Sequence, residues 1–125
     1  MGGMVSRFWI IDDDLSFGRS LKRALDARGF AAEYFGSAQS FLDSVPAGEH
    51  GCAIVDIHMP VCNGLELMGR MRDLHYDIPV IIITGQPYGP SRELALESGA
   101  IGYFQKPFST DSLLEAVRKL DQAEA

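Results

Sequence analysis

Short runs of apolar, β-branched residues alternate along the chain with segments whose apolar residues recur at helical spacing. Five such runs have the length and composition of strands, at residues 5–11, 30–35, 52–56, 79–84 and 101–105. Strands that alternate with helices usually form a parallel sheet covered on both faces. The pattern therefore predicts an α/β fold built on a five-stranded parallel sheet.

Helical segments follow each of the five runs. We predict them at residues 15–28, after Ser37, at 63–74, at 91–98 and after Pro107. Gly29 is expected to stop the first helix, and Ser37 and Thr110 are the expected N-caps of the second and fifth. The fourth helix is the shortest prediction because Pro87, Gly89 and Pro90 delay its start. Five flanking helices and right-handed crossovers give a doubly wound sheet, for which we expect the flavodoxin-like strand order 2-1-3-4-5.

Length and charge limit what the domain can do. A chain of 125 residues fits one compact domain, which we expect to span residues 4–122 with no output domain. The formal charge of −6 argues against direct binding to nucleic acid, since that needs clustered Lys and Arg. No apolar run is long enough to cross a bilayer and no secretory signal is visible, so we expect a cytoplasmic protein that does not contact membranes. Cys52 and Cys62 lack metal-ligand spacing and are expected to be reduced thiols.

Acidic, hydroxyl and basic residues stand at the carboxyl ends of the predicted strands. Asp12 and Asp13 follow the first strand, Asp56 ends the third, Thr84 ends the fourth, and Lys106 follows the fifth. In doubly wound sheets the ligand site lies at this edge. Crowded carboxylates take up protons unless positive charge lies among them, and Mg²⁺ prefers oxygen ligands. The sequence therefore predicts a site for a divalent cation, Mg²⁺ or Mn²⁺.

With a cation in place, this edge can support phosphoryl transfer. Asp56 would be the nucleophile, Lys106 would supply positive charge, and the Thr84 hydroxyl would donate a hydrogen bond. Taken singly, each residue also fits a plain structural role, with Asp14 as a helix N-cap, Lys106 as a surface lysine and Thr84 as a strand residue. Their occurrence together at the ends of different strands favours a functional site.

Four blocks of the chain resemble, in order, the signature blocks of receiver domains in two-component response regulators, the CheY-like superfamily. The blocks are Ile10-Ile11-Asp12-Asp13-Asp14, Val55-Asp56-Ile57-His58-Met59-Pro60, Ile83-Thr84-Gly85 and Lys106-Pro107-Phe108. The resemblance covers essentially the whole chain. The segment from Phe35 to Leu42 also looks like receivers joined to helix-turn-helix transcription factors of the nitrogen-fixation regulator (FixJ) type.

The resemblance implies a role for each residue at the strand ends. Asp56 would be the phosphoacceptor and, with Asp13, a direct ligand of Mg²⁺, while Asp12 would bind the ion through water. The backbone carbonyl of His58 would complete the protein ligands. We expect the His58 side chain itself to be solvated, like a typical loop histidine, and His50 to lie on the surface. His75 is also expected on the surface.

The same resemblance implies a conformational switch. Thr84 and Lys106 match the phosphate-sensing pair of the family, and Tyr103 matches the aromatic position that turns inward when phosphate is bound. Two departures concern the loops, since residues 86–90 replace a small polar helix start and Val61 stands where glycine is frequent. They leave the shape of the signalling face and the rate of dephosphorylation open.

The implied function is a signalling phosphoacceptor rather than an enzyme with turnover. A sensor histidine kinase or histidine phosphotransfer protein would phosphorylate Asp56, and the face formed by the fourth helix, fifth strand and fifth helix would then act on an output domain or downstream protein. A homodimer through that face is expected on family grounds.

Three other functions remain as alternative hypotheses. A phosphatase with an aspartyl intermediate usually carries a second Asp two residues after the nucleophile, where this chain has His58. A flavin carrier needs an amide-rich nest after the first strand, where Asp12 would repel phosphate. A degenerate receiver that serves only for docking is disfavoured by the complete set of acids with Thr84 and Lys106.

Overall fold

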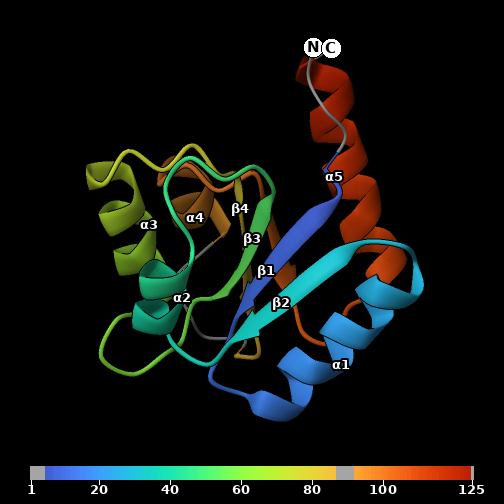
Figure 1. Cartoon of the computed structure of the whole chain (residues 1–125), viewed down its shortest axis with the longest axis horizontal. Coiled ribbons are helices and arrows are strands. Elements are labelled where there is room, and N and C mark those ends of the chain that lie inside the picture. Colours follow the sequence, from blue (N-terminus) through green and yellow to red (C-terminus); the bar gives the residue numbers. More distant parts are fainter. Residues whose placement is uncertain (1–4, 87–91, 125) are drawn as a thin grey trace.

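A computed structural model of the protein describes residues 5–86 and 92–124. Strands and helices alternate strictly along these residues (Figure 1). Their bounds are β1 Arg7–Ile11, α1 Leu15–Ala27, β2 Ala31–Phe35, α2 Ala38–Ser44, β3 Cys52–Asp56, α3 Gly64–Asp73, β4 Val80–Thr84, α4 Arg92–Glu97, β5 Gly102–Gln105 and α5 Thr110–Glu124. All neighbouring strands are parallel, in the order β2-β1-β3-β4-β5. The predicted α/β class and strand order are confirmed.

The helices cover the two faces of the sheet as two groups. Figure 1 shows α2, α3 and α4 on one side and α1 and α5 on the other. Because successive strand residues point to opposite faces, β1 gives Trp9 and Ile11 to the first group and Phe8 and Ile10 to the second. Every residue of β3 and β4 is buried. These central strands are therefore almost continuous apolar runs, as strands covered on both faces usually are.

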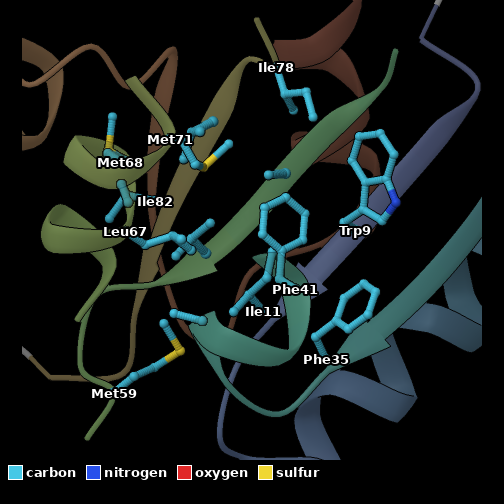
Figure 2. Packing of buried hydrophobic residues seen from close by; sticks show 14 of the residues in the cluster. Trp9, Ile11, Phe35, Phe41, Met59, Leu67, Met68, Met71, Ile78 and Ile82 are labelled. Carbon is cyan, nitrogen blue, oxygen red and sulfur yellow. The ribbon is translucent and has the colours of Figure 1, made fainter. Parts of the chain in front are cut away.

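Aromatic side chains pack together among aliphatic and methionine side chains in the cluster beneath α2, α3 and α4 (Figure 2). Phe41 of α2 has no exposed surface, and its ring centroid lies 6.2 Å from that of Trp9, 5.8 Å from Phe35 and 6.0 Å from Tyr76. Burying a side chain of this kind stabilises a fold by about 1.5–3 kcal/mol. This packing gives the strand ends a rigid support.

Polar side chains cap most of the helices. Asp14 caps α1 and Ser37 caps α2, as expected, each by accepting a hydrogen bond from a backbone N–H in the first turn. Asn63 and Glu66 form a capping box at the start of α3. The prediction of Thr110 as the cap of α5 is wrong. Ser109 occupies that position, because its hydroxyl accepts from Ser112 N at 3.0 Å and the helix already includes Thr110.

Other expectations concern helix ends, the surface and the thiols. Gly29 follows α1 with φ of 88°, a left-handed conformation that favours glycine and ends the helix as predicted. His50 and His75 are exposed, and Cys52 and Cys62 are free thiols, so these predictions are also confirmed. Within residues 5–86 and 92–124, none of the helices has the length and apolar character needed to cross a membrane. The predicted delay of the fourth helix by residues 87–90 lies outside the described residues.

Candidate functional site

The carboxyl edge of the sheet carries the buried polar side chains of the protein. In the described part of the chain, the polar or charged residues classed as buried are Asp12, Asp56 and Thr84. Asp12 directly follows β1, Asp56 is the last residue of β3, and Thr84 is the last residue of β4. Because β1, β3 and β4 are neighbours in the sheet, the three side chains arise side by side. The predicted convergence at one edge is confirmed.

Three carboxylates lie close enough to share a cation. One oxygen each of Asp12, Asp13 and Asp56 can be chosen so that all three lie within 4.8 Å of one another. Asp12 and Asp56 are buried, whereas Asp13 is exposed. Oxygen ligands of this kind, with room for water on the exposed side, fit a divalent cation. The cluster is therefore suited to hold a metal ion.

The crowding shows in the protonation of Asp56. Burial, followed by the charge of Asp12, raises the pKa of Asp56 to about 7, although the Lys106 ammonium and a hydrogen bond from His58 N act in the opposite direction. A carboxyl with this pKa is partly protonated at neutral pH, and the protonated form is a poor nucleophile. Added positive charge at the cluster would restore the carboxylate, which is what a divalent cation does.

Lys106 connects β5 to the acids. Its ammonium donates a hydrogen bond to Asp12 Oδ2 at 2.7 Å and lies 3.9 Å from Asp56 Oδ2. Its backbone N–H donates to the carbonyl oxygen of Thr84 at 2.7 Å, which ties the start of the β5–α5 loop to the end of β4. With a side chain only 16% exposed, Lys106 is not the surface lysine of the plain structural reading.

The three consecutive acids after β1 have three different environments. Asp12 Oδ1 accepts a hydrogen bond from Asp14 N at 2.9 Å, while its other oxygen accepts from Lys106. Asp14 accepts from Phe17 N at 3.1 Å and so caps α1. Asp13 remains exposed. Among these acids, the predicted role as helix N-cap is confirmed for Asp14.

Thr84 is held by the loop that follows it. Its hydroxyl accepts from Gln86 N at 3.1 Å and lies within donating distance of Gln86 O, at 3.2 Å. The side chain is 1% exposed. The hydroxyl must leave the Gln86 carbonyl before it can donate a hydrogen bond to a group on Asp56.

The structure corrects one expectation for His58 and leaves a second one open. Its backbone N–H donates to Asp56 Oδ1 at 3.3 Å, but the ring is not solvated as expected, because Nε2 is buried and has no hydrogen-bond partner in the described part of the chain. The carbonyl of His58 stays a predicted ligand.

Tyr103 lies half-buried on β5 and packs against the cluster under α2, α3 and α4, so its switch role also stays a prediction.

Two aromatic residues near the site were missed by the sequence reading. Tyr34 of β2 donates a hydrogen bond from its hydroxyl to the carbonyl oxygen of Asp12 at 2.5 Å, and the ring of Phe17 lies under the Lys106 ammonium. Both contacts depend on elements packing together, which spacing does not reveal. Gly18 could have indicated the contact with Tyr34, because a glycine inside a helix often marks the close approach of another group. A Cβ there would lie 2.1 Å from Tyr34 Cε1.

The loop after β3 contains a strained residue. Val61 has φ of 70° and its side chain is fully exposed. The left-handed region is unfavourable for a β-branched residue and is typical of glycine, which explains why glycine suits this position.

Comparison with known proteins gives a consistent result. The sequence model of the response regulator receiver domain matches residues 8–118. The transcriptional regulatory protein FixJ of Bradyrhizobium diazoefficiens is 37% identical over 117 residues, which cover 93% of this chain and 57% of FixJ. The structure of response regulator StyR superposes with a TM-score of 0.85 at 32% identity, over 94% of this chain and 59% of that one.

A third relative has been solved in a phosphorylated form. It is a response regulator protein from Burkholderia pseudomallei with a phosphorylated aspartic acid, a calcium ion and citrate, with a TM-score of 0.75 and 27% identity over 96% of this chain and 73% of that one. The present chain spans a little over half the length of its relative FixJ. From the family match over residues 8–118, together with these relatives, the chain belongs to the response regulator receiver domain family.

Proposed function

We propose that residues 4–122 form a receiver domain that accepts a phosphoryl group on Asp56 in a reaction dependent on Mg²⁺ or Mn²⁺. The donor would be a sensor histidine kinase or a histidine phosphotransfer protein. The observation that carries the proposal is the position of Asp56, which is buried between the acids that follow β1 and the ammonium of Lys106. Such a group can react only when its own charge and that of the incoming phosphate are compensated.

Each step of the reaction has a residue suited to it. A carboxylate oxygen of Asp56 attacks phosphorus, the bond from phosphorus to the donor imidazole breaks, and the imidazole leaves with a proton from solvent. Lys106, 3.9 Å from Asp56 Oδ2, would shift from Asp12 toward the transferred oxygens. The Thr84 hydroxyl would donate to one of these oxygens after leaving Gln86. These interactions stabilise charge that develops during transfer.

The cation would be held by Asp13 and Asp56 directly, by Asp12 through water and by the carbonyl of His58. When bound, it would neutralise the crowded carboxylates and polarise the phosphoryl oxygens. The close acids and the raised pKa of Asp56 support this assignment. The phosphorylated aspartic acid and calcium ion in the B. pseudomallei relative support it further.

The output would be a signal rather than continuous turnover. Phosphorylation would shift the equilibrium between two conformations of the face formed by α4, β5 and α5. The Tyr103 side chain would turn inward as the Thr84 hydroxyl moves toward the phosphate. An open hollow on this face is lined by residues that include Arg92, Tyr103, Phe104 and Lys119. It offers both apolar and charged groups to an output domain, a downstream protein or a second copy of the chain. We place this signalling in the cytoplasm, without direct binding to nucleic acid.

The test is labelling by a small phosphodonor such as acetyl phosphate. We expect one acid-stable, base-labile phosphoryl group per chain when Mg²⁺ is present, and none after chelation. Asp56→Asn should remove the label, whereas Asp73→Asn, at the exposed end of α3, should keep it. Equal labelling of Asp56→Asn would remove Asp56 from its role. Rapid, continuous hydrolysis of a phosphomonoester would instead favour the phosphatase reading.

A further inference from the structure

We propose that Phe17 is a positioning residue for Lys106, with the face of its ring holding the ammonium over the acidic cluster. The Lys106 Nζ atom lies 4.2 Å from the centroid of the Phe17 ring. The same atom is 2.7 Å from Asp12 Oδ2 and 3.9 Å from Asp56 Oδ2. The cation thus contacts an aromatic face as well as the two carboxylates. The kinetic part of this inference rests on the proposed phosphorylation of Asp56.

The ring supplies what the acids cannot. A lysine side chain has a flexible four-carbon stem, and here one short hydrogen bond, to Asp12, fixes its end. The electron-rich face of an aromatic ring attracts a cation without a directional bond, and the attraction is strongest where water is excluded. An ammonium over the ring can therefore move between Asp12 and a phosphoryl group on Asp56 and remain attracted throughout. An ion pair in the place of the ring would compete with the phosphate.

Phe17 is itself held from two directions. Its backbone N–H donates to Asp14 Oδ1, so the N-cap of α1 fixes where the side chain begins. Its ring meets that of Phe108 edge to face, with centroids 5.8 Å apart, and Phe108 in turn meets Phe104 of β5 at 5.5 Å. Phe108 is two residues beyond Lys106 in the chain. The ring and the ammonium are therefore positioned by the same loop.

A purely structural role for Phe17 is the alternative. The side chain is half-buried and packs against the cluster under α1 and α5. Substitution by leucine keeps much of this apolar contact and removes the aromatic face, whereas substitution by tyrosine keeps both. Phe30 is a matched control, because it is also half-buried, packs on the same cluster and meets Phe8 edge to face with ring centroids 5.4 Å apart. It directly precedes β2 and so lies at the opposite end of the strands from the acids.

The position of the ammonium can be tested by NMR on metal-free, unphosphorylated protein. Protons above an aromatic face are shifted upfield by the ring current. We expect the ε-methylene protons of Lys106 to be upfield in the wild type, in Phe17→Tyr and in Phe30→Leu, and to return to the ordinary lysine position in Phe17→Leu. An ordinary shift in the folded wild type would overturn the geometry.

The consequence for chemistry is tested by the rate of labelling with acetyl phosphate at saturating Mg²⁺. We expect Phe17→Leu to lower the rate by about three- to tenfold, the range that corresponds to one partly buried cation–π contact. Phe17→Tyr should restore most of the rate, and Phe30→Leu should react like the wild type. Equal rates in Phe17→Leu and wild type, or an equal loss in Phe17→Tyr, would refute the inference.

A Lys106→Ala variant separates this inference from the proposed function. If the wild type is labelled and Lys106→Ala is slow while Phe17→Leu is not, the role of Phe17 fails and the phosphoacceptor function stands. If the wild type is not labelled on Asp56 at all, the proposed function fails, and with it the kinetic role of Phe17.

Discussion

The middle of the sheet and its carboxyl edge differ by a single residue along each central strand. Val55 and Ile83 are buried among apolar side chains, whereas Asp56 and Thr84, the next residues, are buried as polar groups. Burial stabilises the fold at the first pair, because it removes apolar surface from water. At Asp56 it opposes the charged form, which raises the pKa to about 7. The same packing thus stabilises the fold at Val55 and Ile83 and opposes the ionisation of Asp56, which makes the site depend on added positive charge.

The largest effect is expected in the apolar layer, from Phe41→Ala. Phe41 has no exposed surface and contacts three other aromatic rings. Its truncation should lower the free energy of unfolding by about 3–5 kcal/mol, measured by urea denaturation. The molecules that remain folded should still be labelled on Asp56. A loss of labelling without a loss of stability would show that the apolar middle of the sheet and its polar carboxyl edge do not have separate roles.

A smaller effect of opposite sign is expected at the edge, from Asp56→Asn in metal-free protein. The folded pKa of about 7 lies above 3.8, the ordinary pKa of an aspartic acid, so the unfolded chain releases this proton first as the pH rises. The stability of the wild type should therefore fall between about pH 4 and pH 7, while the amide has no such dependence. At pH 8 the variant should be more stable by on the order of 2 kcal/mol.

The metal supplies a control for this difference. Mg²⁺ should stabilise the wild type through binding to the folded state and should narrow its gap to Asp56→Asn. Denaturation curves at pH 4.5 and pH 8, with and without Mg²⁺, measure both effects. A gap that is the same at the two pH values would show that Asp56 carries no raised pKa.

The smallest effect is expected in the loop at the same edge, from Val61→Gly. The side chain is fully exposed, so its removal loses no contact, and the φ of 70° favours glycine. Relief of this strain is partly offset by the greater freedom of glycine in the unfolded chain, which leaves a gain of about 0.5–1 kcal/mol. Val61→Ala keeps a Cβ and should gain less. Destabilisation by Val61→Gly would mean that the loop is held by something other than its backbone.

The sequence predicted the strands and the residues that meet at their ends, because both follow from local patterns, and the order of the strands was expected from the flavodoxin-like fold. Apolar runs and helical spacing specify the elements, and Asp12, Asp56 and Thr84 are identified by where the runs stop. The details that it missed depend on contacts between elements. The burial of the His58 Nε2 atom depends on how the β3–α3 loop packs, and the cap lies at Ser109, one residue before Thr110, because local sequence specifies a helix end only to within a residue or two.

The fit between Gly18 and Tyr34 limits how this protein can evolve. The tyrosine ring occupies the space that any larger residue at position 18 would need, and its hydroxyl binds the carbonyl of Asp12. A side chain added at position 18 alone would clash with the ring, whereas a joint exchange, with a side chain gained in the helix and the ring lost from the strand, would remove the clash. We therefore expect residues 18 and 34 to change together among descendants of this sequence, although one lies in α1 and the other in the edge strand β2.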